Sequence, residues 1–449
     1  MASLAVTLDR AGGAPLPRQL ADAVRAQVVA GTLRPGDRLP SSRSLAAELG
    51  CSRAVTEQAW AQLVAEGWLE GRHGRGTFVA GVPGAAPLTA PPAPVASARD
   101  EPTGLVHLGT GTPWIDPRHA AAWRRAWREV AAARPPRGYD DPRGLPELRE
   151  LLAARLGRLR GLACGPDEVA VVAGTTDGLR HLLGALPPGP VAVEDPGYRA
   201  AVATVEAAGR EVRDLPALQP VADLGGCAAA YVTPAHQHPL GPTMPGPHRV
   251  ALLAAARAAD ALVVEDDYDS EFRYDVAPVP ALASLDRARV AYLGTASKSV
   301  APSMRLGWLV APPALADRVA AQRARTHDAV PWPVQRAFVA LLRDGYVDRV
   351  VRSARRVYAA RAARVGAALA PHGELAGPVA GMYATLRTSA EAAERARRAA
   401  AAAGFAVPLL ADHARSAELH GLVVGFGGCT DEQLDRALAA LVRGLQPTV

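Results

Sequence analysis

Lys298 is the only lysine in a 449-residue chain that contains 50 Lys plus Arg. Arginine stays protonated and is a poor nucleophile, whereas a lysine amine can lose its proton in a shaped pocket and form a Schiff base with an aldehyde. A lone lysine therefore points to pyridoxal 5'-phosphate (PLP). A composition rich in Ala, Arg, Gly and Pro that happens to retain one surface lysine explains the residue equally well, so its neighbours have to decide.

Two further polar segments follow short apolar runs. The turn at 174–178 (GTTDG) leads from a predicted strand into a helix, and the free N–H groups and positive dipole end of such a turn bind anions. The hydroxyls of Thr175 and Thr176 would add to this site, although Gly and Thr also cap helices that bind nothing. Tyr198, which follows 194–197 (EDPG), could lie flat on an aromatic ring or belong to the core.

Residues 265–269 (EDDYD) directly follow the apolar run ALVV. A carboxylate such as that of Asp266 at a strand end can keep a pyridine nitrogen protonated, which pyridoxal chemistry requires. A solvated loop or a divalent-metal site is the more usual interpretation of such a run. Tyr268, three positions after Glu265, favours a phenol donor over a metal ligand.

Thr295, Ser297 and Arg305 lie near Lys298 in the sequence. Two hydroxyls and a guanidinium so close together are the groups of a phosphate clamp. A lysine, phosphate donors, an aromatic platform and a carboxylate for the ring nitrogen are what PLP needs. Their joint occurrence therefore supports a cofactor that no one of them indicates alone.

Apolar runs that alternate with helical stretches must position these residues. Strands separated by helices indicate βαβ units and a mostly parallel sheet that is covered on both faces. Ligands collect at the carboxyl ends of such strands, where the polar residues above fall. The apolar runs are 169–174, 190–196, 228–234, 261–267, 289–295 and 306–312.

Residues 1–80 follow a different pattern. A helix over 17–31 is followed by a Pro-Gly turn, a short helix after Ser41-Ser42, and a third helix from Ser52 through Glu66. Two strands around a glycine-rich tip follow them. This order predicts a helix-turn-helix with a wing, although three packed helices are also a common structural module.

The side chains expected to contact DNA lie on these elements. The first turn of the third helix is expected to be exposed and to read base edges, the preceding helix to meet phosphates, and the wing tip to enter the minor groove or bind phosphate. The predicted contacts are Ser41, Ser42, Arg43, Ser52, Arg53, Thr56, Arg72 and Arg75.

Composition sets limits on these hypotheses. The length predicts two to three domains, and a net charge of +6 is too small to argue for nucleic acid by itself. Four widely spaced cysteines fit neither a disulfide framework nor a zinc site, so we expect a reducing cytoplasm and no metal. We find no export signal and no apolar run long enough to span a membrane.

The N-terminal segment resembles the GntR-type winged helix almost from end to end. The resemblance rests on LRPGDRLPSSRSLAAELGCSR and on the wing sequence GRGTFV. It implies that the domain binds double-stranded DNA as a dimer. Ala54 and Val55 replace the usual Asn-Thr, which leaves the base preference open.

Residues from about 105 to 449 resemble a fold-type I aminotransferase domain, through EDPGY, VTPAHQHPLGPTM, VEDDYDSEFRY and GTASKSVAPSMRLGW. The pairing of a GntR-type winged helix with this domain is the layout of the MocR family of bacterial regulators, also called GabR-like. The resemblance implies that Lys298 forms the Schiff base with PLP and that Asp266 binds the pyridine nitrogen. Tyr268 would lie beside the ring hydroxyl, and Tyr198 would stack on the ring. The phosphate site that it implies comprises Thr175, Thr176, Thr295, Ser297 and Arg305.

The expected architecture is a winged helix-turn-helix domain joined to an α/β PLP-dependent transferase (fold type I) domain with a mostly parallel central sheet. The DNA-binding domain would cover 1–80, and a Pro- and Ala-rich linker 81–104. The PLP-binding domain would cover 105–449, with a smaller C-terminal α/β subdomain from about 345 to 449 that ends in a helix at 431–444.

Three departures from the family pattern matter. Asp177 lies in the glycine-rich turn, where an acid near phosphate is unfavourable unless it points away. His238 replaces the asparagine of the usual Asn-Pro-Thr-Gly, so the amide that tunes the ring oxygen is missing. The stretch 419–434 lacks the arginine that grips a substrate carboxylate in aminotransferases. Candidate replacements are Arg199, Arg387 and Arg415.

The leading hypothesis is a cytoplasmic, homodimeric transcription regulator that binds double-stranded operator DNA and senses PLP, or an adduct of PLP with a small amino compound. A ligand that favours one arrangement of the larger domain would change how the two winged helices are spaced on DNA. A catalytically active aminotransferase with an accessory DNA-binding domain is the alternative. A third hypothesis makes PLP itself the signal, in control of vitamin B6 supply.

Overall fold

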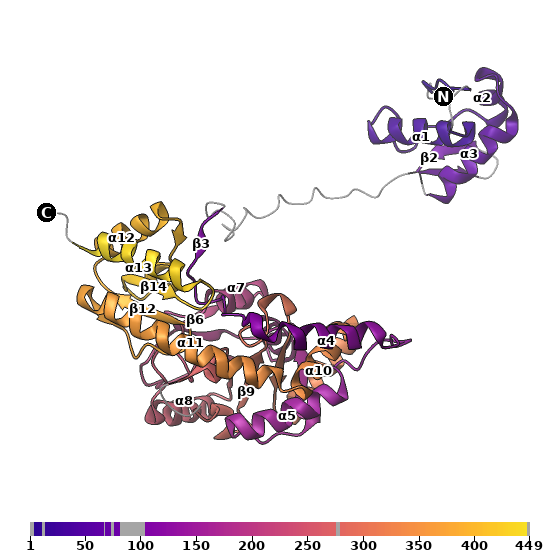
Figure 1. Cartoon of the computed structure of the whole chain (residues 1–449). Coiled ribbons are helices and arrows are strands. Elements are labelled where there is room, and N and C mark those ends of the chain that lie inside the picture. Colours follow the sequence, from indigo (N-terminus) through magenta and orange to yellow (C-terminus); the bar gives the residue numbers. More distant parts are fainter. Residues whose placement is uncertain are drawn as a thin grey trace. The chain divides into compact units, whose positions relative to one another are not determined.

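A computed structural model of the chain describes residues 4–10, 14–66, 68–72, 76–80, 104–274 and 279–446, with the backbone only of Val29 and Arg72. It divides into two compact units, Met1–Asp100 and Glu101–Val449 (Figure 1). The predicted linker, 81–104, lies outside the described residues except for Gly104. Within the described ranges, no helix combines the length and the apolar character that crossing a membrane requires.

The first unit is built from helices and an antiparallel hairpin. Leu20 and Val24, four positions apart, are fully buried, so the first helix forms because one apolar stripe faces the core. The second helix begins where the hydroxyl of Ser41 accepts a hydrogen bond from the Ser44 N–H (3.1 Å). The elements are α1 (Leu16–Val29), α2 (Ser42–Glu48), α3 (Arg53–Ala65), β1 (Leu69–Arg72) and β2 (Gly76–Val79).

The third helix packs against the first two through a small apolar core. Ala59 and Leu63 of α3 are fully buried in it, with Leu45 of α2. The side chain of Val64 is exposed, whereas the neighbouring Leu63 occupies the core. The strands β1 and β2 pair from Leu69↔Val79 to Arg72↔Gly76, which confirms the predicted wing.

The second unit is organised around a seven-stranded sheet in the order β4-β10-β9-β8-β7-β5-β6. Its neighbours pair in parallel, except that β10 is antiparallel to both β4 and β9. The predicted mostly parallel sheet is therefore confirmed. The strands are β4 (Val169–Val172), β5 (Val191–Asp195), β6 (Val212–Pro216), β7 (Ala229–Val232), β8 (Leu262–Asp267), β9 (Val290–Thr295) and β10 (Gly307–Val310).

Both faces of this sheet are covered, as near-continuous apolar strands require. Side chains of β4 alternate between two cores, with Val169 and Val171 in one and Ala170 and Val172 in the other. The second core contains residues of α6 (Thr175–Ala185), α7 (Arg199–Ala207) and α9 (Pro313–Thr326). The first core contains residues of α4 (Ala120–Ala132), α5 (Pro146–Arg160), α8 (Gly246–Ala258), α10 (Trp332–Arg343) and α11 (Tyr346–Leu369).

The C-terminal part adds a second, smaller sheet. Its strands β11 (Glu374–Leu375), β12 (Tyr383–Arg387) and β14 (Gly421–Gly425) are antiparallel neighbours in that order. Helices α12 (Ala390–Ala402) and α13 (Asp431–Leu445) pack against each other beside it, and α13 confirms the predicted final helix (Figure 1). A short parallel pair joins β3 (Val106–His107) to β13 (Phe405–Ala406). The extent of this subdomain, 345–449, stays a prediction.

Candidate functional site

The sheet brings segments from distant parts of the sequence to one edge. Strands β4, β5, β7, β8 and β9 run parallel, so their carboxyl ends meet there. Because β10 runs the other way, its first residues reach the same edge, and Arg305 precedes it. A strand in the usual direction would have carried Arg305 to the opposite side of the sheet.

A cavity of about 170 Å³ opens at this edge, which is room for a small molecule. All nine residues that the sequence assigned to PLP line it. Lys298 and Arg305 supply an amine and a guanidinium, and the others supply hydroxyls, phenols or a carboxylate. The nine are Thr175, Thr176, Tyr198, Asp266, Tyr268, Thr295, Ser297, Lys298 and Arg305.

Lys298 follows β9 and lines the cavity. Its Nζ donates a hydrogen bond to the carbonyl oxygen of Gly111 (2.7 Å). Burial lowers the pKa of the Lys298 amine, and the carboxylates of Asp269 and Asp266 oppose that shift. A lowered pKa increases the neutral, nucleophilic fraction of the amine near neutral pH.

Asp266 is the penultimate residue of β8, and only one of its two carboxylate oxygens accepts a hydrogen bond of normal geometry. Tyr231 donates its hydroxyl to Oδ2, whereas Oδ1 is buried and forms no hydrogen bond of normal geometry with the described residues. Burial raises the pKa of the Asp266 carboxyl to about 7, against the hydrogen bonds of Tyr231 and Thr175. Such an orphaned acceptor suits a ligand that presents an N–H group.

The other acids of the 265–269 run have structural partners. Glu265 is buried and accepts the backbone N–H groups of Leu282 and Ala283 (2.8 Å each). Asp267 is bound by the Arg160 guanidinium (2.6 Å) and the Tyr292 hydroxyl. The run is therefore neither a solvated loop nor, in the described part of the chain, a metal-binding cluster.

A second wall of the cavity consists of hydroxyls and one guanidinium. The hydroxyl of Thr295 donates to that of Ser297 (2.9 Å), so both lie side by side. The Arg305 side chain is exposed towards the cavity, and its guanidinium has no hydrogen bond or ion pair with the described residues. Gly174 lies beside this guanidinium at φ +110°, a backbone conformation that favours glycine. An unpaired arginine beside hydroxyls and a helix N-terminus suits a phosphate group.

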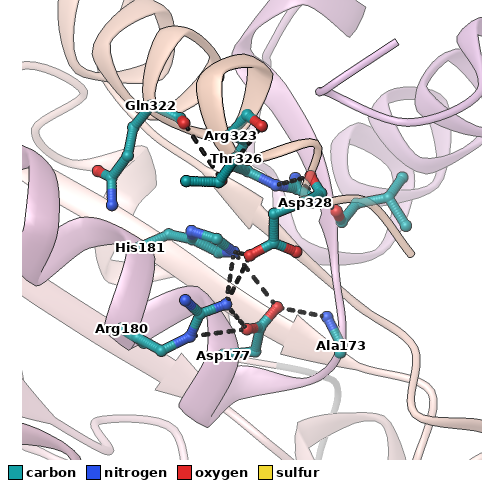
Figure 2. Close-up of polar contacts among 9 residues, drawn as sticks. Ala173, Asp177, Arg180, His181, Gln322, Arg323, Thr326 and Asp328 are labelled. Carbon is teal, nitrogen blue, oxygen red and sulfur yellow. Dashed lines mark hydrogen bonds and ion pairs between the residues drawn. The ribbon is translucent and has the colours of Figure 1, made fainter. Parts of the chain in front are cut away.

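Asp177, which raised doubt about this anion site, points away from it. Figure 2 shows its carboxylate directed towards Arg180 and His181, and it accepts the backbone N–H of Ala173 (2.8 Å). Arg180 also contacts Asp328 (2.8 Å). Asp177 thus holds the turn at 174–178 through contacts outside the cavity, and it does not line the cavity.

Tyr198 and Tyr268, which the sequence assigned to the PLP site, lie beside His238, which the sequence did not assign to it. The ring of His238 lies edge-on to Tyr198 (5.6 Å, 77°) and to Tyr268 (5.9 Å, 84°). Its Nε2 lies 3.1 Å from the hydroxyl of Thr110, and both residues line the cavity. Burial and the cationic groups nearby hold the pKa of His238 well below its ordinary value, so the imidazole is neutral. In the sequence, His238 was notable only as a departure from the family pattern.

The loop that carries Tyr198 is held by the C-terminal part of the chain. The Asp195 carboxylate accepts the backbone N–H groups of Arg415, Ser416 and Ala417 (2.7, 2.7 and 2.9 Å) and the Ser416 hydroxyl (2.8 Å). The carbonyl oxygen of His413 accepts the Gly197 N–H (2.9 Å). These contacts join positions more than 200 residues apart in the chain, which no local pattern could reveal.

None of the three arginines offered as carboxylate ligands lines the cavity. Arg415 binds Asp214 (2.7 Å) and the carbonyl oxygen of Val193 (2.9 Å), so it is a structural residue. Arg387 pairs with Glu374 (3.4 Å) at a separate surface groove. Arg199 is exposed at the start of α7. Among the described residues that line the cavity, Arg305 is the only arginine.

In the first unit, most of the proposed DNA contacts among the described side chains are exposed. Arg53 opens α3 with 65% of its side chain exposed and pairs with Glu57 of the same helix (2.7 Å). Ser52 precedes it and is also exposed, as are Ser41 and Arg43 of the preceding helix. Ser42 is half-buried. Arg75 and the side chain of Arg72 lie outside the described residues.

Thr56 was expected to be exposed for base reading, and this expectation is wrong. Its side chain is fully buried, and its hydroxyl donates to the carbonyl oxygen of Ser42 (2.8 Å) or of Arg53 (2.9 Å). The contact with Ser42 joins α3 to α2, so Thr56 faces the neighbouring helix. It therefore fixes the angle of the helix-turn-helix and cannot reach a base edge.

Comparisons with known proteins cover both units. Residues 16–79 match the family described as "Bacterial regulatory proteins, gntR family", and residues 103–441 match "Aminotransferase class I and II". The chain is 34% identical to the "HTH-type pyridoxine biosynthesis transcriptional regulator PdxR" of Corynebacterium glutamicum, over 98% of each chain. It is also 34% identical to the "Probable rhizopine catabolism regulatory protein MocR" of Rhizobium meliloti, over 79% of this chain and 77% of that protein.

Solved structures resemble the second unit. An archaeal alanine:glyoxylate aminotransferase superposes with a TM-score of 0.68 at 24% identity, over 76% of this chain and 90% of the other, and shows the fold alone. A mutant aspartate aminotransferase of Thermus thermophilus superposes with a TM-score of 0.66 at 25% identity, over 78% of this chain and all of the other.

Proposed function

We propose a sensing function for this chain, which belongs to the MocR-type GntR-family transcription regulators, proteins that join a helix-turn-helix domain to an aminotransferase class I and II domain. The chain is a transcription regulator of this family. We infer that its first domain binds double-stranded operator DNA and that its second domain binds PLP as the signal. PLP binding, the roles of individual residues and the dimeric state belong to the proposal.

The observation that supports a PLP site is the set of unsatisfied groups in one cavity. The buried Asp266 Oδ1 forms no hydrogen bond of normal geometry, and the Arg305 guanidinium has no counter-charge among the described residues. A pyridine nitrogen that carries a proton and a phosphate would satisfy the two. Lys298 lies in the same cavity with an amine whose pKa is lowered by burial.

Each residue would have a distinct part in holding the cofactor. Lys298 would bind it covalently through Nζ, and Asp266 would keep the proton on the ring nitrogen. Tyr198 would stack on the ring, and Tyr268 would hydrogen-bond to its hydroxyl. When bound, PLP would supply an electron-withdrawing ring and a carbonyl group that reacts with amines. The phosphate would lie among Thr175, Thr176, Thr295, Ser297 and Arg305.

The cavity favours PLP itself over an adduct with an amino acid. If the phosphate occupies Arg305, a carboxylate elsewhere in the cavity would meet no other arginine among the described lining residues. The PdxR relative is named as a regulator of pyridoxine biosynthesis, and it matches nearly the whole chain. We therefore propose that the protein controls genes for vitamin B6 supply, with an amine that lacks a carboxylate as the second candidate effector.

On the DNA side, we propose that Ser52 and Arg53 read base edges and that Ser41, Ser42 and Arg43 bind phosphates. Arg72 and Arg75 of the wing complete the proposed contacts. We also propose a homodimer in the cytoplasm, because two winged helices on one dimer would match a two-fold symmetric operator. A ligand that shifts the arrangement of the dimer would then change the affinity for DNA.

The test is to titrate the purified protein with PLP and record its absorbance. A band from covalently bound PLP is expected in the wild type, and Lys298→Ala is expected to lack it entirely, because no other lysine exists in the chain. Pyridoxine 5'-phosphate, which has no aldehyde, is the matched ligand control and should give no such band. In parallel, PLP is expected to change the affinity for DNA upstream of the protein's own gene.

Two outcomes would contradict the proposal. A wild-type protein that stays without the band after incubation with PLP would remove the site assignment. Steady conversion of an amino donor and a 2-oxo acid at the rates of ordinary enzymes would favour the alternative, a working aminotransferase with an accessory DNA-binding domain.

A further inference from the structure

Behind Tyr268, outside the cavity wall, lies a buried pair of ionisable side chains. His236 Nδ1 is 2.7 Å from Asp269 Oδ2, and 3% and 1% of the two side chains are exposed. The Nε2 atom of His236 is buried without a hydrogen-bond partner among the described residues. Because a buried carboxylate is costly unless it is paired, the imidazole is the group that compensates Asp269.

Two tyrosines connect this pair to the cavity. The Tyr268 hydroxyl donates to the carbonyl oxygen of His236 (2.9 Å), and it also lies 3.2 Å from His236 Nδ1. The Tyr383 hydroxyl, on β12, is 2.9 Å from that of Tyr268. The imidazole stacks on the Tyr383 ring at 4.8 Å and 27°. The Tyr268 phenol thus has one proton and several protein acceptors before any ligand arrives.

The backbone at Gly381 lies close to the His236–Asp269 pair. Gly381 has φ +63°, and a Cβ on it would lie 2.7 Å from Asp269 Oδ2 and 3.0 Å from His236 Cε1. A side chain at this position is therefore excluded by space and by conformation. The contact shields the pair from water, so its charge acts on its neighbours through a medium of low dielectric constant.

The charge of Asp269 acts on several groups at once. It raises the pKa of Lys298, in opposition to burial, and it adds to burial in raising the pKa of Tyr268 and of Tyr383. Tyr358 of α11 is raised in the same way, chiefly by burial. Two further ionisable groups take part: Asp266 also raises the pKa of Tyr268, and His236 helps to lower the pKa of His238.

We propose that the His236–Asp269 pair is a positioning element of the cavity, and that its charges set the pH at which Lys298 and Tyr268 change protonation in the PLP-loaded protein. This inference rests on the proposed function. Neither residue touches the cavity, so both act through Tyr268 and Lys298. The Asp269 carboxylate stabilises a positive charge on Lys298, and the imidazole beside it offsets part of that effect.

The test is a pH titration of the absorbance band of the protein loaded with PLP. Asp269→Asn removes the negative charge and keeps the shape, so the midpoint should fall by about one pH unit. His236→Gln keeps an N–H donor for Asp269, but the amide cannot carry a positive charge. The carboxylate is then uncompensated, and the midpoint should rise by roughly half a unit. Shifts of opposite sign are the signature, since loss of packing alone would not reverse the direction.

His119→Gln is the matched control, because His119 also lies beside a carboxylate, 3.5 Å from that of Asp116, but lines no part of the cavity. Its midpoint should equal that of the wild type. Unchanged midpoints in both test variants, or shifts in the same direction, would overturn the inference while leaving the proposed function intact. A wild-type protein without the band would overturn the proposed function as well. Thermal unfolding of each variant verifies that it is folded.

Discussion

The exposed side of α2 and α3, which we propose contacts DNA, and the cavity of the second unit hold polar side chains in different ways. On the helices, Arg43 and Arg53 are exposed, and Arg53 has a partner only one turn away in its own helix. In the cavity, Asp266 and Lys298 are fixed by Tyr231 and Gly111, which come from other parts of the chain. The first arrangement suits a long polymer of repeating charge, and the second suits one small molecule of fixed shape.

The largest expected effect is in the cavity. Arg305→Gln removes the only lining arginine among the described residues, and charge-assisted hydrogen bonds to a phosphate are strong. We expect the affinity for PLP to fall about 100-fold, or about 3 kcal/mol. Pyridoxal, which lacks the phosphate, should bind the variant and the wild type equally. Both affinities are measurable from the absorbance titration.

Arg199→Gln is the control for this change, since Arg199 is exposed and does not line the cavity. Its affinity for PLP should match the wild type. Equal losses of PLP and pyridoxal affinity in Arg305→Gln would mean that the arginine supports the fold of the site and does not bind phosphate.

A smaller effect is expected on the helical face. Arg53→Ala should weaken DNA binding by about 1–3 kcal/mol if the side chain reaches a base edge. Because Arg53 is exposed, the free energy of unfolding should change little. Fluorescence anisotropy on DNA upstream of the protein's own gene, at several salt concentrations, gives the affinity.

Thr56→Val provides the contrast on the same helix. The change keeps the shape but removes the hydroxyl that contacts Ser42, so the free energy of unfolding should fall by about 1 kcal/mol. The folded variant should bind DNA as the wild type does. An affinity that is unchanged in Arg53→Ala and reduced in Thr56→Val would reverse the roles that we give to these residues.

The smallest effect concerns Asp266 without ligand. The pKa of its carboxyl is about 7 in the folded protein, above the value near 4 of an unfolded chain. Between these values the folded state holds more protons, so the Asp266 contribution to stability falls as the pH rises. Asp266→Asn should therefore gain stability relative to the wild type, on the order of 1 kcal/mol more at pH 7.5 than at pH 5.

Thermal unfolding of the two ligand-free proteins at both pH values measures this gain. The same variant should bind PLP more weakly, because the amide cannot stabilise a proton on the ring nitrogen. A gain of equal size at pH 5 and pH 7.5 would show that Asp266 is not the group that titrates in this range.

The elements were more predictable than the contacts between them. Apolar runs predicted six strands of the large sheet, because central strands buried on both faces carry few polar residues. The edge strand β6 was not predicted, since only Leu215 of its five residues is buried. The orientation of Thr56 was missed because it depends on where α2 packs, which the pattern of α3 alone does not contain.

The dependence on contacts between elements also explains which residues of the candidate site could be predicted. Residues at the ends of parallel strands could be predicted, because the fold brings all those ends to one edge. His236, Asp269 and Tyr383 could not, because their pairing depends on a contact between the large sheet and β12. Asp177 was visible in the sequence, but its direction follows from the contact with Arg180, which also binds Asp328 (Figure 2).

The hold of Arg415, Ser416 and Ala417 on Asp195 has a consequence for how such proteins can be assembled in evolution. A gene fragment that ended before residue 410 would keep Lys298 and Asp266 but lose the support of the loop that carries Tyr198. The winged helix, by contrast, has an apolar core made of its own residues. The first unit can therefore be inherited or exchanged as a module, whereas the second must be passed on at least as far as Ala417.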